Sequence, residues 1–124
     1  MKTFKSLEEV EAAGLSPPVH AVVHSVVKNL IKAYADYGRA YDADEDGYTI
    51  LLEEGDTDAD VEAEVGYTLQ EAILEGGYRE NGVFCTCVLH NNEYGITFLV
   101  PDAPWLDPAL REKLVTECGE GASP

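Results

Sequence analysis

Apolar residues recur at a helical period over residues 17–37, and this is the most regular pattern in the chain. Ser16 can cap this helix, Pro17 occupies a first position where no amide donor is needed, and Gly38 is suited to end it. The apolar stripe consists of Val19, Val22, Val23, Val26, Leu30, Ala33, Tyr34 and Tyr37. The pattern therefore predicts a long amphipathic helix with one buried face.

Two shorter helices are predicted from capping signals. Ser6-Leu7-Glu8-Glu9 is a capping box, and Gly14 is a natural stop, so residues 7–13 should be helical. Thr68-Leu69-Gln70-Glu71 is a second capping box, and its helix should end at Gly76-Gly77.

Two strands are expected between the long helix and Thr68. Residues 48–53 are rich in β-formers and follow Asp46-Gly47. Residues 61–65 alternate apolar and acidic side chains, which favours a second strand. A helix is the rival interpretation, because Val61 and Val65 also fit a helical spacing. Gly66 interrupts that spacing and favours the strand.

A hairpin is predicted from residues 83–90 and 93–100 around an Asn91-Asn92 turn, because Asn tolerates the left-handed backbone of tight hairpins. If His90 faces Glu93, a period of two places eight apolar side chains on one face. These are Val83, Cys85, Cys87, Leu89, Tyr94, Ile96, Phe98 and Val100.

The remaining signals lie near the C-terminal end of the sequence. Asp107 and Pro108 open a last helix that runs to about Cys118, and residues 119–124 should form a flexible tail. The sequence predicts a single α+β domain over 1–118, in the order α-α-β-β-α-β-β-α. It should have a mainly antiparallel four-stranded sheet with helices packed on one face.

Charge narrows the classes of partner. The 124 residues include 24 Asp or Glu and 8 Lys or Arg, for a net charge of -16. Direct nucleic-acid binding and anionic membrane surfaces are disfavoured, because both require Lys and Arg.

No apolar run has the length of a membrane span, and the first residues lack the apolar stretch of a signal peptide. Three cysteines, an odd number, indicate free thiols in a reducing compartment, so a cytoplasmic location is expected.

The most specific local motif in the sequence is a calcium-loop pattern. Asp42, Asp44, Asp46, Gly47 and Glu53 match D-x-D-x-D-G-x5-E, and the segment resembles an EF-hand loop. The resemblance implies calcium as a ligand of Asp42, Asp44, Asp46 and Glu53. The context departs from the family, because residues 54–58 do not form an outgoing helix pattern and no second loop follows.

Three other features have a structural interpretation beside a functional one. His20 and His24 lie one helical turn apart, a spacing that can bind a transition metal, but two ligands do not make a metal site. Together with Val27 and Ile31 they indicate a helix-packing or subunit contact instead, and a homodimer through the long N-terminal helix stays open. Cys85 and Cys87 are interpreted as core residues. Trp105 should close the base of the core, with an interface anchor as the alternative.

The acidity is concentrated in one segment. Residues 42–64 hold 11 acidic residues and no Lys or Arg, which leaves -5 for the rest of the chain. A surface patch of one sign repels itself and lowers stability, so its presence suggests that it has a function.

No nucleophile elbow, phosphate loop or dinucleotide fingerprint occurs. We therefore expect a non-enzymatic binding protein of inhibitor, immunity or nucleic-acid-mimic type, with calcium binding or plain solubility as alternatives. The expected partner is a basic protein. Its contacts are Asp42, Asp44, Asp46, Asp56, Asp58, Asp60, Glu62 and Glu64.

Overall fold

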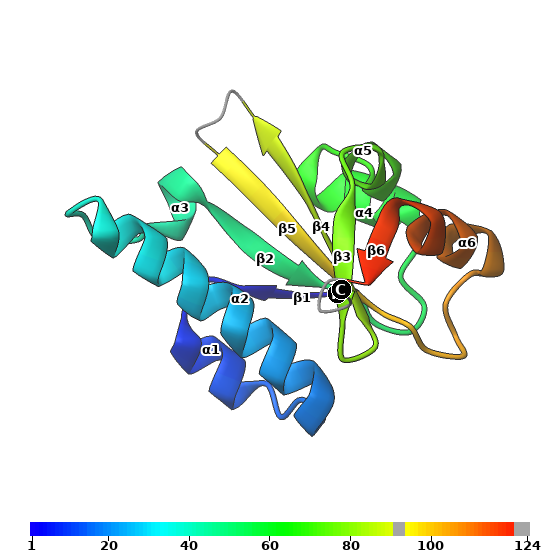
Figure 1. Ribbon diagram of the computed structural model, residues 1–124, viewed down its shortest axis with the longest axis horizontal. Helices are drawn as coiled ribbons and strands as arrows, with labels where there is room; N and C mark the ends of the chain where they lie inside the picture. Colours follow the sequence, from blue (N-terminus) through cyan, green and yellow to red (C-terminus); the bar gives the residue numbers. More distant parts are fainter. Residues whose placement is uncertain (91–93, 121–124) are drawn as a thin grey trace.

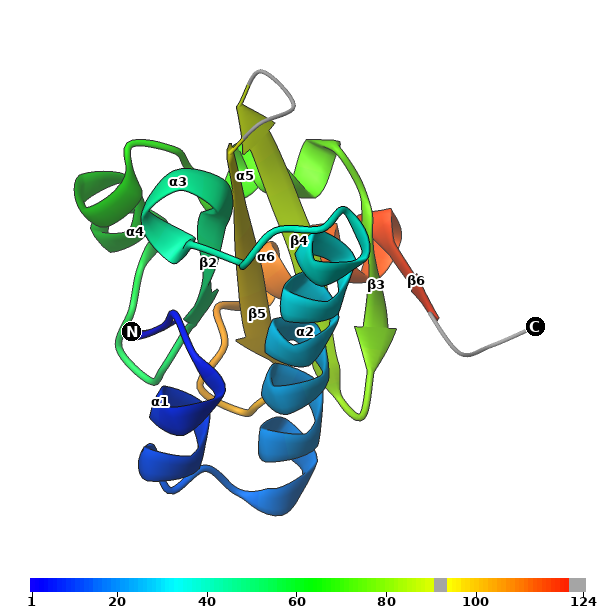
Figure 2. The ribbon, with the colours of Figure 1, turned by 90° about the vertical axis from the view of Figure 1, so that its left-hand side faces the viewer.

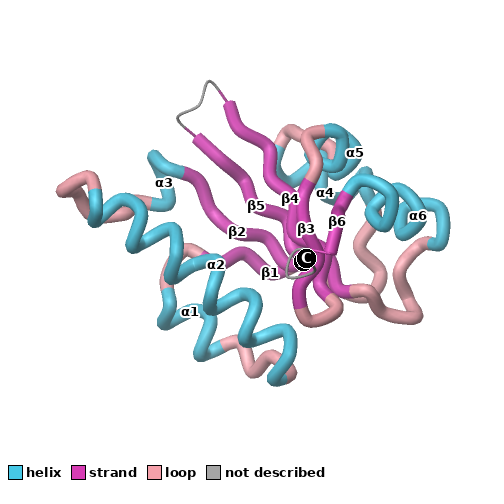
Figure 3. The backbone as a smooth tube through the Cα atoms, in the orientation of Figure 1, coloured by secondary structure: helices cyan, strands magenta, loops and turns pink. Residues whose placement is uncertain are grey.

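The computed structural model describes residues 1–90 and 94–120, and it contains a mixed sheet between two layers of helices (Figures 1 and 3). The strand order is β1-β2-β5-β4-β3-β6. The β2–β5 and β3–β6 pairs are parallel, and the other pairs are antiparallel. In chain order the elements are β1 (Lys2–Phe4), α1 (Leu7–Ala12), α2 (Pro17–Asp36), α3 (Ala43–Asp46), β2 (Gly47–Leu51), α4 (Asp58–Val65), α5 (Leu69–Leu74), β3 (Gly77–Glu80), β4 (Val83–His90), β5 (Tyr94–Pro101), α6 (Pro108–Glu117) and β6 (Cys118–Glu120).

The α+β class and four predicted helices are confirmed, and their caps explain where they begin and end. Ser6, Thr68 and Asp107 accept hydrogen bonds from backbone N–H groups in the first turns of α1, α5 and α6. Pro17 opens α2, and Gly38 follows its end with a φ of 80°. Local sequence therefore marks where these helices begin and end.

The strand predicted over 61–65 is wrong, because this segment belongs to α4. Thr57 and Asp60 form a capping box, each side chain accepting from the other residue's backbone N–H. Gly66 adopts the left-handed conformation with a φ of 81° and ends the helix. The glycine that favoured a strand is thus the C-terminal cap of the rival helix.

The β4–β5 hairpin is confirmed, but its predicted register is wrong by one residue. His90 pairs with Tyr94, whereas the prediction paired His90 with Glu93. The predicted Asn91-Asn92 turn lies outside the described residues. Because side chains alternate along a strand, a slip of one residue moves all of β5 to the opposite face relative to β4. Val83 and Cys85 therefore share a face with Leu99, and Phe84 shares the other with Phe98 and Val100.

Helices cover both faces of the sheet, so the prediction of helices on one face is also wrong (Figure 2). One core lies between the sheet and α4, α5 and α6, and it contains Ile50, Phe84, Phe98 and Val100. The second lies between the sheet and α1 and α2, and it contains Phe4, Leu51, Val83, Cys85 and Leu99. Adjacent residues of β2, β4 and β5 thus belong to different cores.

Three short strands were not predicted, and together with the three predicted strands that the structure confirms, β2, β4 and β5, they form a six-stranded sheet. β1 pairs with β2, while β3 joins the outer side of β4. β6 takes in residues 119 and 120, which were expected in the flexible tail, and it pairs with β3. Strands of three or four residues are too short to show a periodicity, so pairing with longer neighbours creates them. Within the described part of the chain, no helix combines the length and apolar character needed to cross a bilayer.

Asp102 links β3, β5 and α6 through two arginines, and replacing it should destabilise the fold. Its carboxylate accepts from Arg111 Nε at 2.6 Å and Nη2 at 3.0 Å, and from Arg79 Nη2 at 2.6 Å. Asp102→Asn should lower the free energy of unfolding by about 2 kcal/mol near pH 7, the scale of hydrogen bonds to charged groups. Denaturant melts measure this loss.

The pH dependence of the Asp102→Asn effect follows from the pKa of Asp102. Hydrogen bonding from Arg111, followed by the charges of Arg111 and Arg79, holds this pKa below its usual range. A depressed folded-state pKa stabilises the fold above the unfolded-state value near 4, and the contribution is lost as pH falls through the folded-state value. The difference between wild type and Asp102→Asn should therefore shrink below about pH 4. The exposed Asp36→Asn variant is the control, and a constant difference down to low pH would contradict this account.

Candidate functional site

The acidic segment does not form one continuous surface, because β2 and the loop after it divide the segment. Asp42, Asp44 and Asp46 lie in and beside α3, where β2 begins. Residues 56–64 follow the far end of β2 and lead into α4, which packs on the opposite face of the sheet from α2 (Figure 1). The eight predicted partner contacts are therefore placed in two separate regions.

The four predicted calcium ligands are not brought together. Asp42 caps α3 by accepting from the Asp44 N–H at 3.0 Å. Asp46 is buried, pairs with Arg39 and accepts from the Asp42 N–H at 2.9 Å. Glu53 lies beyond the other end of β2, and the five residues of that strand span about 16 Å. At the start of the pattern, Asp42 and Asp46 accept local hydrogen bonds. At its end, Glu53 lies near the first residues of the chain and pairs with the Met1 α-amino group.

Most aspartates of the second region also stabilise local structure. Asp56 accepts from the Glu53 N–H at 2.7 Å and pairs with the Met1 α-amino group at 2.7 Å. Asp58 accepts from the Leu69 N–H at 2.6 Å, which joins the start of α4 to α5. The Thr57 backbone N–H lowers the pKa of Asp60, so this capping carboxylate stays ionised. Glu62 and Glu64 are exposed on α4.

A pocket forms where this second region meets the start of α6, and we call it the acidic pocket. Its volume is about 360 Å³. Asp56 and Asp58 enter it from the loop before α4 and from α4 itself, and Asp107 enters from the cap of α6. Half-buried Trp105 contributes an aromatic wall and also packs against the core beneath α6. The lining residues are Gly55, Asp56, Thr57, Asp58, Trp105, Leu106, Asp107 and Leu110.

The acidic pocket combines negative charge with an aromatic side chain. The residues that line it include three carboxylates and no Lys or Arg. One cation already lies beside it, because the Met1 α-amino group pairs with Asp56. The hydrogen bond to Asp56 raises the pKa of this amino group above its usual value. The arrangement is suited to bind an ammonium or guanidinium group.

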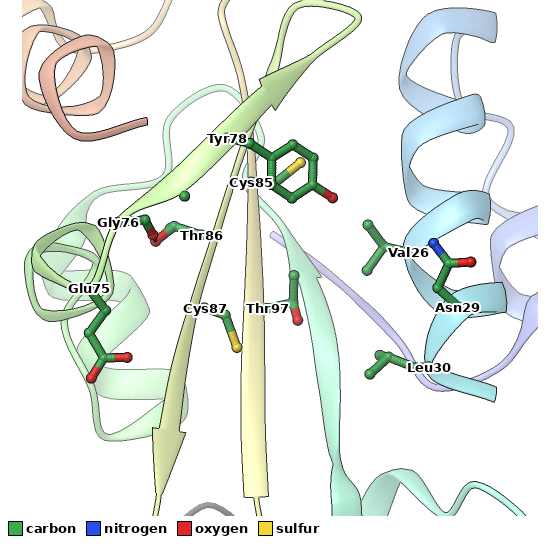
Figure 4. A pocket seen from close by; sticks show the side chains of 11 residues that line it. Val26, Asn29, Leu30, Glu75, Gly76, Tyr78, Cys85, Thr86, Cys87 and Thr97 are labelled. Atoms are coloured by element: carbon green, nitrogen blue, oxygen red, sulfur yellow. Dashed lines mark hydrogen bonds between the residues drawn. The ribbon is translucent and has the colours of Figure 1, made fainter. Parts of the chain in front are cut away.

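A second, more open pocket lies between α2 and the sheet, and we call it the sheet-face pocket (Figure 4). Its volume is about 490 Å³. Val26, Asn29 and Leu30 of α2 face the side chains of β3, β4 and β5, with Glu75 at the far side. The strand residues that line it are Gly77, Tyr78, Cys85, Thr86, Cys87 and Thr97.

Burial favours the neutral forms of Cys85, Cys87 and Tyr78 in the sheet-face pocket. Burial raises the pKa of Cys85 to about 11 and also raises that of Cys87. Burial is likewise the main cause of the raised pKa of Tyr78. A thiol must ionise to act as a nucleophile, so these cysteines have low reactivity near pH 7. Cys85 is buried as predicted, whereas Cys87 is half-buried at the pocket wall.

The structure brings together residues that the sequence kept apart. Trp105 and Asp107 are about 50 positions from Asp56 and Asp58, and no local pattern connects the two segments. The sequence pattern predicts Asp107 only as a helix cap. In the histidine strip, Val27 is buried against the sheet and His20 contacts Glu11 of α1, so the helix-packing interpretation of this strip is confirmed.

No protein-family model matches this chain, and neither the curated proteins nor the solved structures give a match. The case for a function therefore depends on the geometry and charge of the molecule.

Proposed function

We propose that this protein is a non-enzymatic binding protein whose acidic surface docks on a basic protein partner, as an inhibitor, immunity protein or nucleic-acid mimic does. The acidic pocket receives a Lys or Arg side chain of that partner. The supporting observation is that Asp56, Asp58 and Asp107 line one pocket of about 360 Å³ together with half-buried Trp105.

The chemistry of the acidic pocket favours a cationic side chain over a neutral one. Asp58 and Asp107 each accept one backbone N–H, and a carboxylate can accept at both oxygens. Hydrogen bonds between carboxylates and guanidinium groups are about twice as strong as neutral ones. A cation over an indole ring adds about 0.5–2 kcal/mol. Trp105 thus supplies contact area and the aspartates supply charge recognition.

The surface around the pocket extends the same preference. Asp60, Glu62 and Glu64 are exposed on α4, directly after the pocket residues. The negative electrostatic potential of these acidic side chains attracts basic surfaces and speeds their association, and it repels phosphate backbones and anionic lipids. A basic protein surface that normally contacts nucleic acid is the best match in charge.

Oligo-arginine peptide binding, measured by fluorescence anisotropy, tests this proposal. The variant Asp56→Asn/Asp58→Asn/Asp107→Asn keeps one acceptor oxygen on each side chain and removes three charges. We expect it to weaken binding at least about tenfold, or 1.4 kcal/mol. Trp105→Leu should weaken binding about threefold or more, because it removes the cation–π contact. Binding by the wild type should fall steeply as salt is raised.

A matched control separates the pocket from net charge. Glu8→Gln/Glu71→Gln/Glu112→Gln also removes three charges, all at exposed positions outside the acidic pocket. We expect this variant to bind within about threefold of the wild type. Equal losses in the two triple variants would show that only net charge matters. Binding that does not respond to salt would exclude the acidic surface as the contact.

A further inference from the structure

The junction of α1 and α2 brings two histidines and a glutamate to one point. His20 and His24 lie one turn apart on α2, and their rings stack with centroids 5.7 Å apart. Glu11, near the end of α1, faces both rings. Its Oε1 lies 3.1 Å from His20 Nε2 and 4.0 Å from His24 Nε2. Two imidazole nitrogens from one helix thus converge on one carboxylate oxygen from another.

Core packing positions this cluster. Val10 of α1 and Val22 and Val23 of α2 are buried in the same core, which docks α1 along α2. Glu11 follows Val10 directly, so its side chain lies at the rim of that contact. The three side chains keep access to solvent, with exposed fractions of 34% for His20, 37% for His24 and 61% for Glu11. A metal ion can therefore reach them without unfolding of the core.

We propose that Glu11, His20 and His24 form a binding site for a divalent transition metal of the Zn²⁺ class. Two histidines spaced by four residues on a helix present their nitrogens to one metal ion. Zinc binds imidazole nitrogen and carboxylate oxygen at about 2.0–2.2 Å, so ligand atoms around a tetrahedral zinc lie about 3.3 Å apart. The fourth position is open to water.

The site closes when the metal binds. The 3.1 Å distance between Glu11 and His20 already suits a shared metal ion, whereas the 4.0 Å distance to His24 is longer than this geometry needs. Accordingly, no three His, Cys, Asp or Glu side chains of residues 1–90 and 94–120 are already arranged to hold a metal. The His24 ring and the Glu11 carboxylate, 37% and 61% exposed, are free of the core and can move to shorten this distance.

The donor set determines which metals this site prefers. Imidazole suits Zn²⁺, Ni²⁺ and Cu²⁺, whereas Ca²⁺ requires six to eight oxygen ligands. The net charge of -16 raises the local concentration of every cation, so selectivity must come from the histidines. The site lies on the α1–α2 side of the sheet and the acidic pocket lies on the other, so the two proposals are tested independently.

Isothermal titration of the full chain with Zn²⁺ near pH 7.5 tests the site. We expect one histidine-dependent ion per chain, and Co²⁺ at the same site should give the visible absorption of four-coordinate cobalt. Glu11→Gln should weaken Zn²⁺ binding at least about tenfold, since even outer-shell partners of metals contribute 10- to 100-fold. His20→Ala/His24→Ala should abolish it. Excess Ca²⁺ should not compete.

Two controls make the result decisive. Glu8→Gln changes the same charge on the same short helix at an exposed position, and we expect it to bind Zn²⁺ like the wild type. His24→Gln is a conservative replacement whose fold is checked by circular dichroism, and it should lose most of the affinity. Wild-type affinity in the double histidine variant would assign the zinc to other groups, such as the cysteines. Wild-type affinity in Glu11→Gln would exclude the three-ligand site.

Discussion

Gly47→Ala should prevent folding or lower the free energy of unfolding by more than about 4 kcal/mol, a loss that only a few mechanisms produce. Gly47 opens β2 with a φ of 106° and pairs with Gly95 of β5. A Cβ atom at this position would lie 1.7 Å from the carbonyl oxygen of Gly95, which is backbone and cannot turn aside. Expression, circular dichroism and denaturant melts would measure the loss.

Gly55→Ala is the matched control for this result. Gly55 also has a positive φ, 93°, but a Cβ there would meet nothing within 4 Å. Its replacement should cost only about 1–2 kcal/mol, the penalty of the left-handed backbone itself. Equal losses at the two glycines would show that the close approach of β2 to β5 is not the cause. Gly47, predicted as the bend of a calcium loop, has its structural role in the sheet.

Phe98→Ala and Leu99→Ala should both destabilise the protein strongly, by about 3–5 and 2–5 kcal/mol respectively. The two residues are neighbours on β5, and both are fully buried at 0% exposure. Phe98 packs in the core beneath α4, α5 and α6, and Leu99 packs in the core beneath α1 and α2. Large losses from adjacent positions require that both faces of the strand are covered. Urea melts of the two variants give the values.

Tyr37→Ala controls for the loss of a large side chain outside either core. Tyr37 is 86% exposed after the end of α2, so its removal should change stability by less than about 0.5 kcal/mol. A one-sided sheet would tolerate Leu99→Ala nearly as well as this control. A small effect of Leu99→Ala would therefore contradict the two-core arrangement.

Two runs of apolar residues in the sequence indicate a sheet that is covered on both faces. Ile50, Leu51 and Leu52 are consecutive apolar residues, as are Phe98, Leu99 and Val100. Continuous apolar runs indicate strands covered on both faces, whereas alternation indicates one covered face. The predicted hairpin register assumes a two-residue Asn91-Asn92 turn and takes the eight apolar side chains on one face as its support. This support fails when both faces are buried, because either register then buries apolar residues.

The candidate sites depended more on tertiary structure than the helices did. The acidic pocket needs Trp105 and Asp107 beside Asp56 and Asp58, and packing of α6 against the sheet brings them there. The proposed metal site needs Glu11 beside His20 and His24, and the packing of α1 on α2 supplies it. Sequence alone identified the histidine pair but contained no pattern that connected it to Glu11.

The sequence by itself determined the helices α1, α2, α5 and α6, the strand β2, the strands of the hairpin and the α+β class. Caps, prolines, glycines and apolar periods act over a few residues, so these elements can be recognised locally. Tertiary structure alone decided the β4–β5 register, the parallel pairing of β2 with β5 and the addition of β1, β3 and β6. These features depend on which distant segments bury each other's apolar faces, and that free energy belongs to the assembled core and not to any one segment.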